Sequence, residues 1–271
     1  QKIALRWWNK NEYSGYDAII CDGAVRSGKT LSMSIAFVSW AMTCFDGGYF
    51  AMCGKTITSL KRNVINPLLS MLGQLGFMCI EKVSKNYFEI TLCNRVNRFY
   101  IFGGKDEGSA SLIQGITLSG VFLDEVALMP RSFVEQAIAR CSVPNSKMWF
   151  NCNPEHPYHW FYREWIKKAE EKKALYVHFT MDDNPSLTDE VKERYSRLYS
   201  GAFYDRFVLG KWTAVSGAVY PMFDSSKHIF DDEVICDRYV ISCDYGTVNP
   251  SSFGLWGRCN DKWYRLKEYY Y

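Results

Sequence analysis

The chain has 271 residues, of which 48% are hydrophobic. This is enough apolar material for a large core, and it excludes a disordered or fibrous protein. The formal net charge of +3 is small, so contact with nucleic acid would depend on local clusters of basic residues. Ten cysteines without a C-x-x-C pair favour reduced thiols in a cytoplasm, and no apolar run reaches the roughly 20 residues that span a bilayer.

The first chemical motif lies between an expected strand and an expected helix. Residues 17–22 (DAIICD) form an apolar run typical of a buried strand, and residues 30–45 carry apolar residues at helical spacing. Between them, residues 23–30 (GAVRSGKT) match the P-loop pattern G-x-x-x-x-G-K-[ST] at every fixed position. Such a loop binds phosphate through backbone N–H groups and the N-terminal end of the helix. A glycine-rich turn that binds nothing is the alternative.

The P-loop pattern predicts ATP and Mg²⁺ as ligands. The residues expected to bind the nucleotide are Gly23, Arg26, Ser27, Gly28, Lys29 and Thr30. Lys29 would reach the β- and γ-phosphate oxygens, and the Thr30 hydroxyl would be a ligand of Mg²⁺. Arg26 either acts as a catalytic arginine finger on the γ-phosphate or points to solvent. Tyr13 or Tyr16, ahead of the strand, is a candidate for stacking on adenine.

A second strand and a basic helix follow. Residues 49–54 (YFAMCG) predict the strand, and the segment after it predicts an amphipathic helix that ends near Gly73. Lys55, Lys61 and Arg62 in this segment could contact phosphates. A solvated helix face is the more common reason for such charges and is the favoured interpretation.

An acidic pair ends the next apolar strand. Residues 120–123 (GVFL) predict a buried strand that is followed by Asp124 and Glu125. Asp124 would hold Mg²⁺, usually through water, and Glu125 would be the catalytic residue that polarises the attacking water. Together with Lys29, this pair favours ATP hydrolysis over nucleotide binding alone. A strand end followed by a helix-capping acid is the alternative.

Two asparagines follow another strand. Residues 148–150 (MWF) predict the strand, and Asn151 and Asn153 come directly after it. Their amides are expected at the carboxyl edge of the sheet, beside the P-loop strand, where they could sense the γ-phosphate or the attacking water. The sequence Asn-x-Asn-Pro is also a plain turn sequence. The stretch 152–159 contains a cysteine and two histidines, but a zinc site is disfavoured because no second ligand pair has the right spacing.

Strands and helices alternate along the chain and predict an α/β fold. The expected architecture is a P-loop NTPase fold with a largely parallel central sheet and one antiparallel pair around residues 87–102. Further expected elements are strands at residues 90–94, 99–104 and 174–180 and helices at 131–141 and 188–199. The ATPase domain is expected over residues 1–212 and a loop-rich linker over 213–236. Residues 237–271 alternate apolar and polar residues around a turn at GRCND, which predicts a β-hairpin.

These motifs together resemble those of the large terminase subunit of tailed bacteriophages and prophages. The resemblance follows the family's order through nearly the whole chain. It rests on GAVRSGKT, LIQGITLSGVFLDEVALMP, MWFNCNPEHPYHWFY, MDDNPSLTDEVKERYSRLYSGAFYDRFVLGKW and YVISCDYGTVNPSSFGLWG. It implies that Asn151 and Asn153 belong to a coupling motif, that residues from about 180 to 212 form a lid, and that residues 237–271 begin an RNase H-like nuclease domain.

The resemblance also gives Asp244 a role. At the end of the first strand of the nuclease domain, it would be the first carboxylate that binds Mg²⁺ or Mn²⁺. Cleavage with two metal ions needs several converging acids. Glu268 is expected on the second strand of the hairpin, where it could face the same pocket. The later acids of the family's site are absent, so this chain is expected to be an incomplete nuclease that does not cut DNA alone.

As a large terminase subunit, the chain would hydrolyse ATP and move double-stranded viral DNA into a procapsid, and the intact protein would also cut concatemeric DNA. The implied partners are double-stranded DNA, the portal protein, the small terminase subunit and further copies of the chain in a ring. The implied place is the host bacterial cytoplasm, transiently docked on the procapsid, and no membrane is involved.

The arginine finger and the function class each keep alternatives. Relatives often have an arginine where this chain has Gln114, so the departure favours Arg26 in cis over a finger from a ring neighbour. Arg140 is another candidate for such a finger. A P-loop helicase or translocase of recombination or repair type, and a binding protein switched by nucleotide, are the alternatives to a packaging motor.

Overall fold

The structure, a computed structural model, describes residues 1–213, 228–229, 233–246 and 251–270. The chain divides into two compact units, Gln1–Ala218 and Val219–Tyr271. Most of the predicted linker, residues 213–236, lies outside the described residues. The predicted domain limits therefore stay a prediction.

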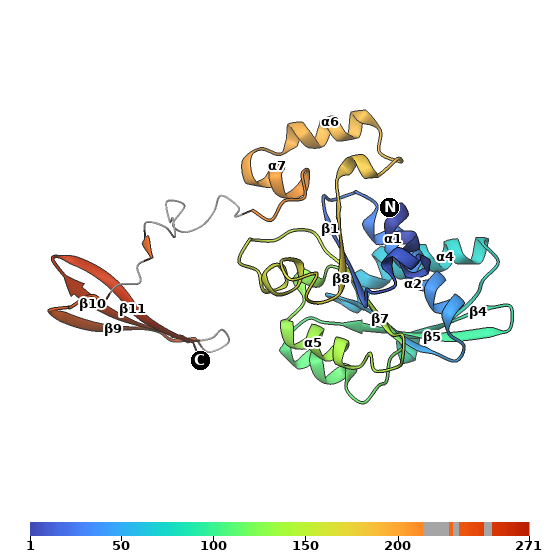
Figure 1. Ribbon diagram of the computed structural model, residues 1–271, viewed down its shortest axis with the longest axis horizontal. Helices are drawn as coiled ribbons and strands as arrows, with labels where there is room; N and C mark the ends of the chain where they lie inside the picture. The colour runs from blue at the N-terminus through green and yellow to red at the C-terminus, as the bar shows by residue number, and fades with distance from the viewer. Residues whose placement is uncertain (214–227, 230–232, 247–250, 271) are drawn as a thin grey trace. The chain divides into compact units, whose positions relative to one another are not determined.

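The first unit is built on an eight-stranded sheet with the strand order β3-β4-β5-β2-β6-β7-β1-β8 (Figure 1). The strands are β1 (Ala18–Gly23), β2 (Tyr49–Gly54), β3 (Met78–Lys82), β4 (Tyr87–Leu92), β5 (Arg95–Gly103), β6 (Gly120–Leu123), β7 (Lys147–Asn151) and β8 (Ala174–Phe179). All neighbours from β5 to β8 in this order are parallel, whereas β4 pairs antiparallel with both β3 and β5. The predicted α/β class, the largely parallel sheet and the antiparallel pair around residues 87–102 are confirmed.

Helices cover both faces of the sheet. They include α1 (Lys2–Arg6), α2 (Lys29–Cys44), α3 (Ile57–Leu60), α4 (Asn66–Gln74) and α5 (Arg131–Ala139). The first four pack in one core and α5 in the other. Ile19 and Cys21 of β1 point into the first core, and Ala18 and Ile20 point into the second, as the alternation of side chains along a strand requires. No helix in the described ranges is long and apolar enough to cross a membrane.

The outermost strand, β3, is absent from the sequence-based prediction. Met78 and Ile80 have exposed fractions of 58% and 41%. An edge strand that is weakly buried carries a weak hydrophobic signal, since it has a neighbour on one side alone.

Two short helices follow β8, beyond the carboxyl ends of β1 and β8, and are orange in Figure 1. They are α6 (Asp189–Leu198) and α7 (Gly201–Phe207), and they belong to the region expected to form a lid. Ala24 of the P-loop is buried in a small core with Met181 and Val208, against which Tyr195 and Tyr204 also pack. The described part of this region therefore shares its core with the P-loop.

The second unit contains a three-stranded antiparallel sheet with the order β11-β10-β9. Its strands are β9 (Arg238–Asp244), β10 (Ser252–Cys259) and β11 (Lys262–Tyr270). β10 and β11 form the predicted hairpin, with Asn260 and Asp261 at positive φ in its turn. β9 adds a third strand, and all of its residues are exposed.

Candidate nucleotide-binding site

The P-loop, the acidic pair and the two asparagines lie at one edge of the sheet. Strands β6, β7 and β1 are parallel neighbours in that order, so their carboxyl ends meet at the same edge. β1 leads into residues 23–30, β6 leads into Asp124 and Glu125, and β7 ends at Asn151. Tertiary structure thus brings together three segments that are far apart in the sequence.

Backbone conformation explains the glycines of the P-loop. Gly23 has a φ of +130°, and a Cβ atom there would lie 1.9 Å from the carbonyl oxygen of Phe179. Gly28 has a φ of +83° and is the N-cap of α2. A side chain at either position would be strained, because L-residues rarely adopt these conformations. The glycines therefore allow the loop to turn tightly ahead of the helix.

Arg26 also has a positive φ, of 59°. The side-chain amide of Asn184 donates a 2.6 Å hydrogen bond to the Arg26 carbonyl oxygen, which holds this uncommon conformation in place. Arg26 is exposed, a position that is compatible with either of its predicted roles.

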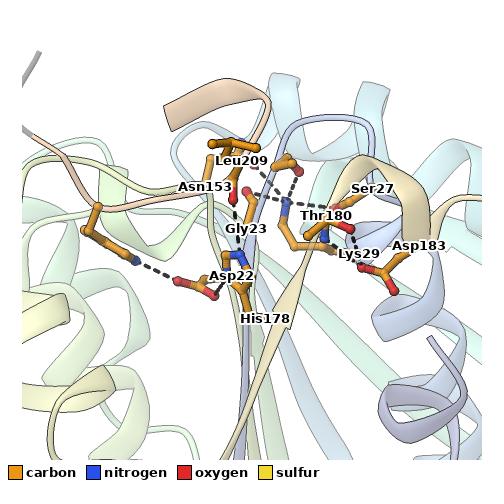
Figure 2. Close-up of polar contacts among 11 residues, drawn as sticks. Asp22, Gly23, Ser27, Lys29, Asn153, His178, Thr180, Asp183 and Leu209 are labelled. Atoms are coloured by element: carbon orange, nitrogen blue, oxygen red, sulfur yellow. Dashed lines mark hydrogen bonds and ion pairs between the residues drawn. The ribbon is translucent and has the colours of Figure 1, made fainter. Parts of the chain in front are cut away.

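Lys29 lies buried at the centre of the site (Figure 2). Its Nζ donates to the carbonyl oxygens of Gly23 and Ala24 at 3.2 and 2.8 Å. It also donates to Ser27 Oγ at 3.4 Å and to Asn153 Oδ1 at 2.9 Å. Burial lowers the pKa of Lys29, because the ammonium loses its hydration. An anion in the loop would be a stronger partner for this ammonium than the neutral oxygens that now surround it.

Thr30, Asp124 and Asn151 form a polar cluster at the same edge. Asn151 Nδ2 donates to Thr30 Oγ1 at 2.8 Å and to Asp124 Oδ1, and Thr30 Oγ1 donates to Asp124 Oδ1 at 3.4 Å. Burial raises the pKa of Asp124 to about 6. The buried amide oxygen of Asn151 has no hydrogen-bond partner among the described residues. A hydroxyl, a carboxylate and an unsatisfied amide oxygen are ligands that Mg²⁺ prefers, so these residues fit that ion.

Glu125 has a left-handed backbone, with φ of 56° and ψ of 45°. This conformation is uncommon for a residue with a side chain, and such strain is often found at functional sites. Glu125 lines a cavity of about 100 Å³ together with Asn153 and Arg206. A cavity of this size with several polar groups can hold water.

Arg206 of α7 is a residue that the sequence did not single out. Its guanidinium forms an ion pair with Glu155 and donates a 2.6 Å hydrogen bond to the carbonyl oxygen of Pro154. Both partners directly follow Asn153. The region expected to be the lid is therefore tied to the segment that follows β7, and no local pattern could reveal this because the partners are far apart in the chain.

Tyr13 and Tyr16 lie at the opposite edge of the sheet. They precede β1, and Lys147, the first residue of β7, donates a 2.6 Å hydrogen bond to the carbonyl oxygen of Tyr16. A strand of six residues is about 20 Å long. Neither tyrosine therefore lies beside the P-loop, and stacking on adenine stays a prediction.

Arg140 and Lys61 lie away from the P-loop of this chain. The carbonyl oxygen of Arg140 accepts from the N–H of Leu118, just before β6, which places Arg140 at the amino edge of the sheet. Its role as a finger for a ring neighbour stays a prediction. Lys61 forms a 2.7 Å ion pair with Glu81, in agreement with a surface role. In the part of the chain that the structure describes, which includes residues 152–159, no group of three or more His, Cys, Asp or Glu residues could hold a metal ion.

Asp244 is the last residue of β9 in the second unit. It pairs with Ser252 of β10, while Glu268 of β11 pairs with Gly254. Both acids are on one face of the sheet, because residues two apart in β10 share a face. β10 lies between them and separates their strands by roughly 10 Å. The predicted role of Asp244 stays a prediction.

Fold and site together define a P-loop domain of the α/β class, with an acidic pair and a polar strand end beside the loop. Residues 20–227 match the family described as terminase large subunit, T4likevirus-type, N-terminal. The chain belongs to this family of phage large terminases.

Solved structures of large terminases resemble the whole chain. The large terminase of a thermophilic bacteriophage in complex with ADP is 52% identical, with a TM-score of 0.78, over 100% of this chain and 67% of that one. The same protein in complex with ATP-gamma-S gives 51% identity and a TM-score of 0.76, over 100% and 66% of the two chains. The HK97 bacteriophage large terminase shares the fold. It is 12% identical with a TM-score of 0.61, and the match covers 96% of this chain and 60% of that one. The curated proteins gave no match.

Proposed function

We propose that this chain is the ATP-hydrolysing part of a motor that moves double-stranded viral DNA into a procapsid. The observation that carries the proposal is the 2.9 Å hydrogen bond from Lys29 Nζ to Asn153 Oδ1. It joins the lysine of the P-loop directly to the segment after β7, where the family resemblance places a coupling motif. The complexes of the thermophilic phage's large terminase with ADP and with ATP-gamma-S support a nucleotide as the ligand of the P-loop.

Binding of ATP would change the partners of Lys29. A phosphate oxygen carries more negative charge than an amide oxygen, so Lys29 would leave Asn153 for the β- and γ-phosphates. Asn153 would then take a new partner, and Pro154 and Glu155 would move with it. Because Arg206 contacts both of these residues, the change would reach α7. We infer that this is how occupancy of the site is passed to a surface that grips DNA.

Hydrolysis would use the two acids differently. Thr30 and Asp124, with Asn151 beside them, would hold Mg²⁺, which when bound neutralises charge on the phosphates. Glu125, at the wall of the cavity, would accept a proton from the attacking water. Arg26 would reach the γ-phosphate in cis and stabilise the charge that develops there.

The remaining parts of the proposal follow from family membership. DNA would be held through its phosphates without sequence readout, since a packaging motor must accept every sequence. The working form would be a ring of identical subunits, docked in the host cytoplasm on the portal protein and supplied with DNA by the small terminase subunit. In the intact protein, Asp244 would contribute to a nuclease site that uses Mg²⁺ or Mn²⁺.

Steady-state ATP turnover, with and without blunt duplex DNA, tests the proposal. We expect Glu125→Gln to reduce turnover by about 100-fold or more, because a general base contributes about that factor. The Lys29→Ala variant should lose ATP binding itself. Glu135→Gln is the matched control, since Glu135 is exposed on α5 and its side chain pairs with Arg131. It should turn over ATP at the wild-type rate.

Three results would contradict the proposal. One is ATP binding that survives Lys29→Ala, and another is turnover that survives Glu125→Gln. The third is unwinding of a tailed duplex by the wild-type chain, which would favour a helicase. Stimulation of turnover by blunt duplex DNA supports a translocase.

A further inference from the structure

A buried carboxylate directly before the P-loop has no part in the proposed chemistry. Asp22 is the fifth residue of β1 and has an exposed fraction of 0%. An ionised carboxylate that is removed from water is costly unless it is paired and hydrogen bonded. The partners of Asp22 therefore indicate why the residue is there.

Both oxygens of Asp22 have a partner. Oδ1 lies 2.9 Å from His178 Nδ1, and Oδ2 accepts a 2.6 Å hydrogen bond from Trp212 Nε1. The other nitrogen of His178, Nε2, lies 3.2 Å from the carbonyl oxygen of Leu209 (Figure 2). Asp22 is thus joined to β8 through His178 and to the chain that follows α7 through Leu209 and Trp212.

The partners of His178 favour its charged form. A carbonyl oxygen can only accept, so Nε2 must donate to Leu209, and an ionised Asp22 requires Nδ1 to donate as well. An imidazole that donates from both nitrogens is a cation. The hydrogen bond to Asp22 accordingly raises the pKa of His178, and the resulting ion pair compensates the buried charge of Asp22.

The backbone after α7 lies directly on the P-loop. Gly210 has a φ of +68°, and a Cβ atom there would lie 2.4 Å from the backbone nitrogen of Ala24 and 2.6 Å from Gly23 Cα. The N–H of Val25 donates a 3.1 Å hydrogen bond to the carbonyl oxygen of Phe207. The P-loop and the end of the lid region therefore cannot move independently while these contacts hold.

We propose that Asp22, His178 and Trp212 form a latch that fastens the end of the lid region, residues 207–212, to the base of the P-loop. These are positioning residues, because they act through the loop and the lid and not on the nucleotide itself. The inference deepens the proposed function, on which its nucleotide-dependent part rests. Because of the latch, a shift of the P-loop around a bound phosphate moves the lid region.

Amide hydrogen exchange of the full chain, with and without ADP, tests the latch. Trp212→Phe removes one donor to Asp22 and keeps an aromatic ring where Trp212 stacks on Tyr162, at 4.9 Å between ring centroids. We expect residues 181–209 to exchange about ten-fold faster in this variant without ADP, as loss of a hydrogen bond to a charged group implies. We also expect ADP to protect this segment in the wild-type chain and much less in the variant.

The control is Trp256→Phe in the second unit, which removes the indole donor of a 2.8 Å hydrogen bond to Ser242 Oγ. It should leave exchange in residues 181–209 unchanged. His178→Gln is a second variant at a half-exposed position, and it provides an independent test if Trp212→Phe folds poorly.

The pH profile separates a latch from simple packing. The charged groups around His178 are Asp22 and Lys29, and Tyr176 also interacts with Asp22. The raised pKa of His178 means that the cation is present below about pH 6.5 and is lost as the pH rises through the higher folded value. Protection of residues 181–209 should therefore fall with rising pH in the wild-type chain and stay flat in His178→Gln.

The latch would be overturned if, without ADP, residues 181–209 exchanged at the wild-type rate in both Trp212→Phe and His178→Gln. Failure of the wild-type chain to bind ADP would instead overturn the proposed function. The comparison of exchange rates measured in the absence of nucleotide would then still test the latch. If ADP binds but protects the variants as fully as the wild-type chain, the coupling part of the inference is wrong.

Discussion

At the scale of single residues, Asp124 shows a conflict between stability and its proposed role in holding Mg²⁺. Burial raises its pKa to about 6 from an ordinary value of 3.8, so above pH 6 the folded state carries an ionised group at a cost that the unfolded state does not have. We expect Asp124→Asn to raise the free energy of unfolding by about 1–3 kcal/mol at pH 7.5 in metal-free buffer. The gain should disappear near pH 4, where Asp124 of the folded wild-type chain is neutral. Urea unfolding at the two pH values measures this. Asp261→Asn, at a 97% exposed side chain, is the control, and a gain of the same size there would contradict the explanation.

At the scale of elements, the contact between α7 and the segment after β7 depends on Arg206. Its ion pair with Glu155 is largely buried, at 17% and 27% exposure of the two side chains, and its hydrogen bond to Pro154 satisfies a backbone carbonyl. We expect Arg206→Gln to lower the free energy of unfolding by about 1–3 kcal/mol, because it leaves these partners unsatisfied. The exposed pair of Arg131 and Glu135, at 55% exposure for each, is the matched case, and Arg131→Gln should cost less than about 0.5 kcal/mol. Denaturant unfolding compares the two variants, and equal losses would show that the α7 contact contributes nothing beyond a surface ion pair.

At the scale of the whole molecule, the two units differ in how much they bury. β1 is buried along its length with a hydrophobic core on either side, whereas every residue of β9 is exposed, including Ile241 at 72%. Local stability follows buried apolar contact. We therefore expect amides of β9 to exchange at least about 100-fold faster than those of β1 in the 271-residue chain. Mass spectrometry of peptides from the two strands measures the ratio, and equal protection would mean that β9 is covered in solution.

The candidate site was predictable in outline because its motifs are local. Residues 23–30 carry the P-loop pattern, and the acidic pair and the two asparagines each follow an apolar strand, so each group could be assigned to a strand end. That these ends meet depends on the strand order β6-β7-β1. Of this order, the sequence analysis predicted only that Asn151 and Asn153 lie beside the P-loop strand. The buried position of Lys29 and its hydrogen bond to Asn153 could not be predicted from the sequence and are seen only in the tertiary structure.

The sequence by itself determined the fold class, the P-loop and the residues that end its neighbouring strands, because hydrophobic periodicity and motif spacing are properties of the local sequence. Only the tertiary structure decided that Tyr13 and Tyr16 lie at the sheet edge opposite the P-loop, that Arg206 reaches Glu155, and that Asp22 accepts a hydrogen bond from Trp212. These facts depend on contacts between residues distant in sequence, such as the 190 positions that separate Asp22 from Trp212. Such contacts are fixed by the packing of whole elements, which leaves no local pattern in the sequence.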